Sequence, residues 1–181
     1  VLEAFPRATL IAGPDLQMGQ AISCRRGQRW EWDGVLFEIV HPPAAFPLLG
    51  NDSSCVLKIS AADHALLLTG DVERAAERSL VAADLDLTAD VIVVPHHGSA
   101  TSSTAAFTTA TRPTVAIVSA GYANQWGFPK EEVVARWERV GATTVVTGEA
   151  GAVSLKFAAD DSFEVSAGRA RRHRAWRIDT D

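Results

Sequence analysis

Three residues with metal-binding side chains follow two apolar runs of the chain. Asp71 comes directly after Leu66–Gly70, and His96 and His97 come directly after Val91–Pro95. An apolar run of this length that is closed by Gly or Pro predicts a buried strand. Because sequential strands usually lie close together, we expect Asp71 and the His pair to be neighbours in space. Carboxylate and imidazole are ligand types of zinc and manganese hydrolase sites.

Each of these residues also has an ordinary structural use. Asp71 directly precedes a segment of helical periodicity, so its carboxylate could cap that helix. Successive residues of an extended chain point to opposite sides, so only one of His96 and His97 would face a given metal. The other would bind substrate or pack, or the pair would be one buried and one exposed imidazole. His41 and His64, in predicted turns, and His173 are poorer ligand candidates, so these residues alone make half a metal site.

The elements that must position these residues follow from the spacing of the apolar side chains. Asp33-Gly34 is a strong hairpin signal, and residues on both sides of it alternate in polarity, which predicts a hairpin over 29–40. The apolar residues between 72 and 83 recur at helical spacing. Further strands are predicted at 8–11, 21–24, 54–59, 65–69, 91–94, 114–119, 143–147 and 152–157, and further helices from Ser102 or Ser103 to Ala110 and from Pro129 to Val140.

This order of elements predicts an α/β or α+β sandwich, with sheets inside and helices outside. We expect one domain over residues 1–167 and a polar, basic tail over 168–181. Hydrophobic residues make up 47% of the 181 residues and charged residues 22%, which is typical of a globular domain. The net charge of −5 argues against broad electrostatic capture of nucleic acid, whereas the arginines of the tail allow local contacts with phosphates or anionic lipid.

The chain contains two cysteines, Cys24 and Cys55, which are too few for a disulfide framework. We favour two buried thiols over a single bridge, and neither state settles the redox compartment. No apolar run approaches the roughly 20 residues of a membrane-spanning helix, and no signal peptide is visible. The first residue, Val1, is not an initiator Met, which suggests an excised or processed chain.

Several motifs together resemble one known family. They are Asn51-Asp52-Ser53-Ser54-Cys55-Val56-Leu57, Leu68-Thr69-Gly70-Asp71, Pro95-His96-His97-Gly98-Ser99, and Gly121-Tyr122-Ala123-Asn124 continuing to Gly127-Phe128-Pro129. In this order they resemble the metallo-β-lactamase-like domain at the C-terminus of ComEC-type competence proteins, which are DNA-uptake channels of the bacterial inner membrane. The resemblance runs across essentially the whole chain and is specific in the combination of its motifs.

The resemblance implies an αββα sandwich, a site for two divalent metal ions such as Zn or Mn, and hydrolysis of a DNA phosphodiester. Asp71 would be the carboxylate that bridges the metals. His97 would be the late His ligand, and His96 would lie near the scissile phosphate. The remaining site residues would be Asn51, which stands where relatives often have a further His ligand, and Ser54, Ser99 and Asn124, which would line the site.

Three departures from the family pattern bear on activity. The early His/Asp-rich metal motif of the family would precede Val1. Many members carry a Lys in the strand that here reads Val91–Val94, and a His where Phe128 stands here. The Lys would supply a cation for the transition state, and the His would supply a phosphate contact. We therefore expect partial or no metal binding and no activity from this chain by itself.

The resemblance also implies partners and a location. The parent protein would lie in the inner membrane through transmembrane segments outside this chain, with this domain on the periplasmic side, where it would degrade one strand of incoming DNA. Two alternatives are a non-catalytic module that handles DNA or docks in the same channel, and a hydrolase acting on another phosphodiester or a lactone. We also expect that a core face left exposed would favour self-association.

Overall fold

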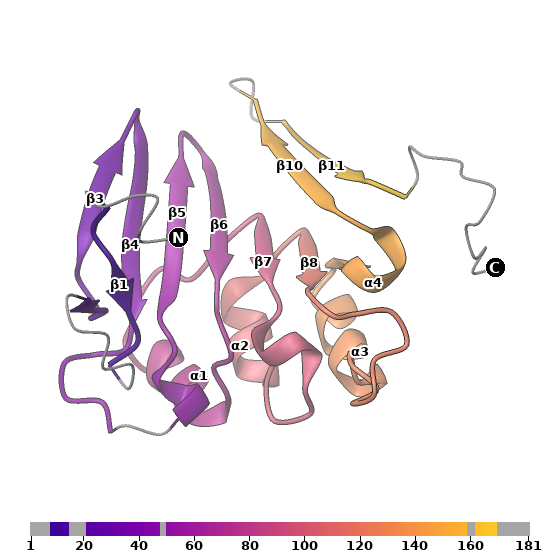
Figure 1. Ribbon diagram of the computed structural model, residues 1–181, viewed down its shortest axis with the longest axis horizontal. Helices are drawn as coiled ribbons and strands as arrows, with labels where there is room; N and C mark the ends of the chain where they lie inside the picture. Colours follow the sequence, from indigo (N-terminus) through magenta and orange to yellow (C-terminus); the bar gives the residue numbers. More distant parts are fainter. Residues whose placement is uncertain (1–7, 15–20, 48–49, 159–161, 170–181) are drawn as a thin grey trace.

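The computed structural model describes residues 8–14, 21–47, 50–158 and 162–169. Within these ranges, seven strands form a mixed sheet in the order β3-β4-β5-β6-β7-β8-β9 (Figure 1). Its strands are β3 (Arg29–Trp32), β4 (Val35–His41), β5 (Val56–Ala61), β6 (His64–Leu68), β7 (Val91–Val93), β8 (Val115–Val118) and β9 (Thr143–Val146). The helices are α1 (Arg74–Val81), α2 (Ala105–Thr111), α3 (Glu131–Arg139) and the short α4 (Thr147–Ala150), with 3-10 turns η1 (Gly50–Ser53) and η2 (Pro95–Gly98).

The strands β3 to β6 make the antiparallel part of the sheet. The predicted hairpin is confirmed and turns at Asp33-Gly34, where both residues have positive φ. The strands predicted at 54–59 and 65–69 are β5 and β6, which pair with each other. The strand β5 pairs with β4 on one side and with β6 on the other. His41 ends β4 and His64 begins β6, so both belong to strands and not to the turns in which they were predicted.

The strands β6 to β9 are parallel, and this part of the sheet positions the predicted chemistry. In the register of the sheet, Leu68 of β6 lies opposite Val93 of β7, and Val93 lies opposite Ile117 of β8. Parallel strands covered on both faces are typically continuous apolar runs. This explains why the segments that form β6, β7 and β8 could be recognised as strands in the sequence. Because the strands run in one direction, the residues that follow them emerge at the same edge of the sheet.

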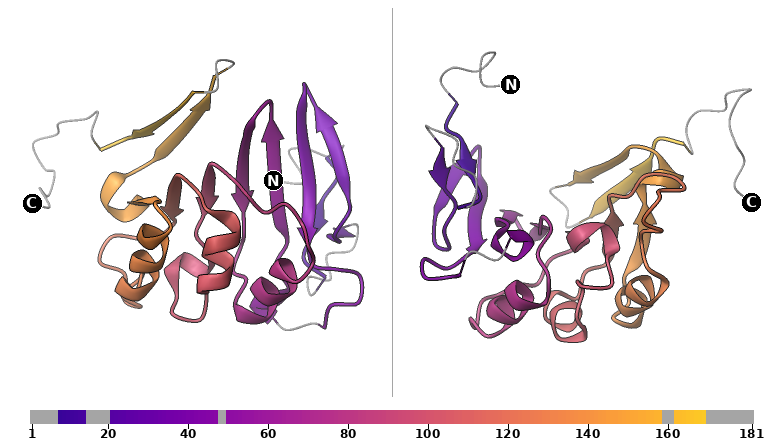
Figure 2. Two further views of the ribbon diagram at one scale, coloured as in Figure 1. Left: turned by 180° about the vertical axis from the view of Figure 1, so that it is seen from behind. Right: turned by 60° about the horizontal axis from the view of Figure 1, so that its bottom comes forward.

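The two faces of the sheet carry different layers (Figures 1 and 2). On one face, Ile92 packs in a core that includes Leu80 of α1, Phe107 of α2 and Trp137 of α3. On the other face, Val91 packs with Val115, Ile117 and the hairpin of β10 (Val153–Phe157) and β11 (Phe163–Ala167). The predicted fold class, an α/β fold with sheet layers and helices outside, is confirmed; the strand β11 was not predicted.

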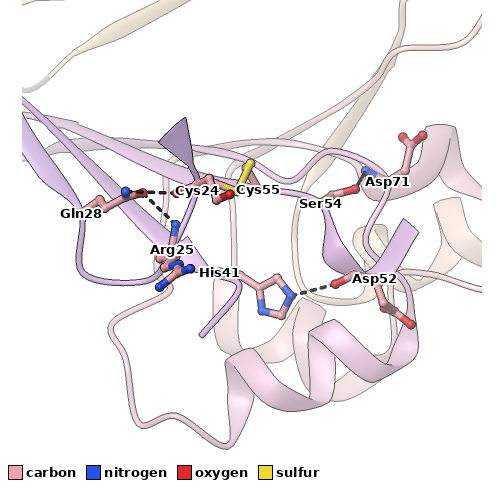
Figure 3. The surroundings of a disulfide bond; sticks show 9 residues. Cys24, Arg25, Gln28, His41, Asp52, Ser54, Cys55 and Asp71 are labelled. Atoms are coloured by element: carbon pink, nitrogen blue, oxygen red, sulfur yellow. Dashed lines mark hydrogen bonds between the residues drawn. A yellow bond between two sulfur atoms is a disulfide. The ribbon is translucent and has the colours of Figure 1, made fainter. Parts of the chain in front are cut away.

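A small parallel pair, β1 (Ile11–Ala12) and β2 (Ile22–Ser23), is joined to the main sheet by a disulfide between Cys24 and Cys55. The expectation of two free thiols is therefore wrong, and the single bridge is the observed state. Figure 3 shows that the bridge lies beside Ser54, whose side chain reaches the backbone of Asp71. Of the predicted basic tail, residues 170–181 lie outside the described residues.

The helix caps differ from those predicted. The carboxylate of Asp52, not that of Asp71, accepts hydrogen bonds at the N-terminus of α1, from the backbone N–H groups of Glu73 (2.8 Å) and Ala76 (2.9 Å). The predicted cap failed because a distant segment of the chain supplies the acceptor. Thr104, not Ser102 or Ser103, caps α2 through a bond from the Phe107 N–H. The helix α3 begins two residues after Pro129, with Lys130 at its N-cap position.

Candidate functional site

A pocket of about 380 Å³ opens where β6, β7 and β8 end at the same edge of the sheet. Backbone contacts beyond the strands fix the segments that form it: His96 N–H donates to the Gly70 carbonyl (3.1 Å), and the Thr69 hydroxyl donates to the Val93 carbonyl (2.6 Å). Asp71 and both histidines of the pair lie in this pocket. The lining residues are Asp71, His96, His97, Ser119, Ala120, Gly121, Asn124, Trp126 and Phe128.

The imidazole of His97 is oriented by a backbone group. Its Nδ1 lies 2.7 Å from the carbonyl oxygen of Ser119, and because a carbonyl can only accept, Nδ1 carries the proton of the neutral ring. The lone pair of Nε2 is then free, and Nε2 lies 3.7 Å from Oδ1 of Asp71, with both side chains about half exposed. A metal-bound histidine typically donates its second nitrogen to a carbonyl or carboxylate in this way.

The imidazole of His96 has a carboxylate partner instead. Its Nδ1 lies 2.9 Å from Oε1 of Glu73, and the hydroxyl of Thr101 donates to the same carboxylate oxygen at 2.8 Å. A carboxylate that orients an imidazole is a common arrangement for acid–base chemistry and for a positively charged anion contact. Sequence reasoning missed Glu73 as the partner of His96; the i, i+2 spacing of Asp71 and Glu73 before the helix is the signal that could have found it.

The backbone of the His pair is left-handed, not extended. His96 and His97 have φ of 48° and 55°, and Gly98 follows with φ of 81°. For a non-glycine residue this conformation costs roughly 1–2 kcal/mol, and such strain clusters at functional sites. The expectation that one histidine faces a metal while the other binds substrate or packs assumed an extended chain; the backbone is not extended, and both side chains line the pocket. Gly98 is required by space as well, since a Cβ there would lie 2.6 Å from Cβ of Pro129.

The other four predicted site residues are placed around this pocket in different ways. Asn124 lines it but uses its side chain within its own loop, with Nδ2 donating to the carbonyls of Gly121 and Phe128. Ser54 accepts a bond from the Asp71 N–H (3.3 Å). Ser99 is buried and its hydroxyl lies 3.0 Å from that of Thr101, whereas Asn51 is exposed on η1. These last three residues are not among those that line the pocket.

The donors present fit part of a metal centre. Asp71 and His97 present one oxygen and one nitrogen lone pair to the same space. A catalytic zinc takes three protein ligands, and the residues that the structure describes contain no group of three or more His, Cys, Asp or Glu side chains that could hold a metal ion. These residues therefore do not complete a metal centre.

Of the three weaker histidine candidates, His41 and His64 lie elsewhere, and His173 lies outside the described residues. His41 is fully buried, and its Nε2–H donates to the carbonyl oxygen of Asp52 at 2.8 Å. Burial lowers the pKa of His41, and the bond to the Asp52 carbonyl acts in the opposite direction. His64 is buried and packs against Phe157 and Phe163 of the β10–β11 hairpin. Neither side chain lines the pocket.

The fold and this site identify a class of protein. A family model described as "Metallo-beta-lactamase superfamily" matches residues 3–122. The chain therefore belongs to the metallo-β-lactamase superfamily.

Relatives named for competence and recombination narrow this class. A sequence named competence protein ComA, from Neisseria gonorrhoeae, is 42% identical over 153 residues, which are 83% of this chain and 22% of the relative. Recombination protein 2 of Haemophilus influenzae is 34% identical over 162 residues, 88% of this chain and 20% of the relative. ComE operon protein 3 of Bacillus subtilis is 29% identical over 133 residues, 74% of this chain and 17% of the relative. The match is to a metallo-β-lactamase domain of the ComEC type, and this chain spans about a fifth of the length of these relatives.

Proposed function

We propose that this chain is part of a metal-dependent phosphodiester hydrolase domain that cuts one strand of DNA during its uptake. The observation that carries the proposal is the pairing of His97 and Asp71. The Ser119 carbonyl holds the proton of His97 on Nδ1, so the Nε2 lone pair faces a carboxylate oxygen 3.7 Å away across an open pocket. With Nδ1 donating to the carbonyl, the neutral imidazole offers the lone pair of Nε2, and a lone pair beside a carboxylate oxygen is suited to a cation.

Asp71 and His97 contribute two ligands in this proposal, and the remaining ligands come from outside the described residues. When bound there together with the remaining ligands, a divalent metal would supply an activated water and a Lewis acid for the phosphoryl oxygen. His96, held by Glu73 at 2.9 Å, lies beside this pair and is the group that contacts the scissile phosphate. Ser54 and Ser99 act indirectly, since Ser54 fixes the backbone of Asp71 and Ser99 contacts Thr101 beside His96.

The location of the parent protein belongs to the same proposal. We infer a domain on the periplasmic side of the inner membrane, attached through segments outside this chain. The Cys24–Cys55 disulfide supports an oxidising compartment, because cytosolic proteins rarely keep a structural bridge. Among the residues described, no helix is long and apolar enough to cross a membrane.

Metal titration and DNA cleavage test the proposal. In the full-length protein, H97Q and D71N should each weaken Mn²⁺ or Zn²⁺ binding, measured by calorimetry, and abolish cleavage of a labelled oligonucleotide. The matched variant H96Q should retain metal binding and lose cleavage. This chain alone should bind metal weakly and not cut DNA.

The outcomes separate the alternatives. Tight binding of two metals by this chain alone, with robust cleavage, would contradict the incomplete ligand set. A full-length protein that binds metal but cuts no DNA would indicate a docking module. Cleavage confined to small phosphodiesters would indicate another hydrolase of the superfamily.

A further inference from the structure

The loop between β8 and α3 presents two large aromatic side chains to solvent beside the pocket. Trp126 is 62% exposed and Tyr122 is 48% exposed, and Trp126 lines the same pocket as His96 and His97. An exposed tryptophan of this kind contributes little to the hydrophobic core. A ring that faces solvent is available to stack on another planar, aromatic group.

Hydrogen bonds within the loop hold the backbone that carries these rings. The side chain of Asn124 donates to the carbonyls of Gly121 (3.0 Å) and Phe128 (2.7 Å), and its Oδ1 accepts from the Phe128 N–H (3.0 Å). At the base of the loop, Gly148 of α4 lies so close that a Cβ there would come within 2.5 Å of the Tyr122 backbone nitrogen. The loop is thus braced before any ligand arrives, which lowers the ordering cost of binding.

Two cations accompany the rings. Lys130 Nζ donates to the carbonyl of Trp126 at 2.7 Å and lies 5.4 Å from the centroid of the Phe128 ring. The guanidinium of Arg169 lies 5.8 Å from the centroid of the Tyr122 ring. The carboxylates of Asp71 and Glu73 lie in or beside the pocket itself, so an anionic ligand would be attracted to the loop side of the pocket.

We propose that Trp126 and Tyr122 form a stacking platform for unpaired bases of single-stranded DNA, with Lys130 and Arg169 binding its phosphates. This inference rests on the proposed function and adds how the substrate strand is held. Aromatic stacking with nearby cations is the usual means of binding single strands without sequence preference. In a duplex the flat faces of the bases are covered by their neighbours, so the platform selects single strands.

A second exposed tryptophan provides a matched control. Trp32 is 69% exposed and lies on β3, at the opposite edge of the main sheet from β9. Its replacement removes a ring of the same size and exposure without touching the pocket. A loss of DNA binding in W126A but not in W32A would then be due to the position of Trp126, and not to the removal of an exposed tryptophan in general.

Binding of a fluorescein-labelled oligothymidylate of about ten nucleotides, followed by anisotropy in EDTA, tests the platform without metal or catalysis. W126A should weaken binding about tenfold and Y122A should weaken it less, whereas W126F should retain most of the affinity. The control W32A should bind within about twofold of the unaltered chain. K130M should reduce the salt dependence of binding, and duplex DNA should bind equally to W126A and W32A.

Equal binding of the single strand by W126A and W32A would contradict the proposed stacking platform. The absence of measurable binding by the unaltered chain would contradict it as well. Trp126-dependent binding to anionic phosphatidylglycerol vesicles, without binding to the oligonucleotide, would overturn it in favour of a membrane contact. In either case, metal-dependent cleavage by the full-length protein would leave the proposed hydrolase standing, so the two failures can be told apart.

Discussion

At the scale of single residues, two aspartates divide the structural and chemical roles between them. Asp52 is buried and its carboxylate accepts two N–H groups at the start of α1, while its carbonyl accepts from His41. The carboxylate of Asp71 caps no helix and faces His97 in the pocket. Because Asp52 caps α1 instead, the Asp71 carboxylate is available to bind a ligand.

Replacing these two aspartates should therefore have opposite consequences. D52A removes the acceptor of two N–H groups, and we expect it to lower the free energy of unfolding by about 1–2 kcal/mol. D71A should change that free energy by less than about 0.5 kcal/mol, because the side chain is about half exposed and binds no helix N–H group. Urea unfolding followed by circular dichroism measures both. A larger loss in D71A than in D52A would show that the cap is assigned to the wrong residue.

The sequence allowed the two ends of the candidate site to be located, but not its conformation. Asp71 and the His pair could be found because buried parallel strands end abruptly on polar residues. The left-handed backbone of His96 and His97 could not be predicted, since it is held by tertiary contacts such as the packing of Gly98 on Pro129. Propensity does not indicate when a side chain far along the chain, such as Asp52, replaces a local cap.

Whole elements that depend on tertiary packing were also hard to predict from the sequence. The strands β3 to β9 have apolar patterns that the sequence shows directly, whereas β11 is a five-residue strand that owes its place to packing on the back of the sheet. The disulfide was undervalued for a similar reason: Cys24 and Cys55 are 31 residues apart, and only the fold brings them together.

At the scale of elements, Glu77 ties α1 to the segment that enters α2. Its side chain is fully buried, and its two carboxylate oxygens accept hydrogen bonds from the N–H groups of Ser103 and Thr104. Burial raises the pKa of Glu77, and the bonds from Thr104 and Ser103 oppose this shift. Arg136 of α3 donates to the carbonyls of Ser102 and Ser103, so three helices meet at one turn.

We expect E77Q to lower the free energy of unfolding by about 1–3 kcal/mol, because the amide places a donor against a backbone N–H. The measurement is the urea midpoint at constant m-value. E138Q is a suitable control, since Glu138 is exposed on α3. An E77Q midpoint equal to that of E138Q would mean that the turn is held without this carboxylate.

At the scale of the whole molecule, one covalent link joins the β1–β2 pair to the main sheet. The Cys24–Cys55 bridge closes a loop of 31 residues, and Cys24 is fully buried. It lies next to Ser54, and the hydroxyl of Ser54 accepts from the Asp71 N–H, so the link adjoins the segment that carries Asp71 (Figure 3).

Reducing this bridge should cost about 2–4 kcal/mol of the free energy of unfolding, since the unfolded chain regains the freedom that the loop had removed. Urea unfolding with and without a phosphine reductant measures the loss. The double variant C24S/C55S should unfold near the reduced midpoint and ignore the reductant. An oxidised and a reduced chain with the same midpoint would mean that the link is dispensable for stability.

The close contact at Gly148 has a consequence for how this chain can vary. A Cβ at this position would collide with backbone atoms of Ala120, Gly121 and Tyr122, which cannot rotate away as a side chain can. The connection to the β10–β11 hairpin, on the far side of the sheet from the helices, is therefore coupled to the aromatic loop at the pocket. Natural variants should keep glycine at 148, or change it only together with the path of residues 120–122.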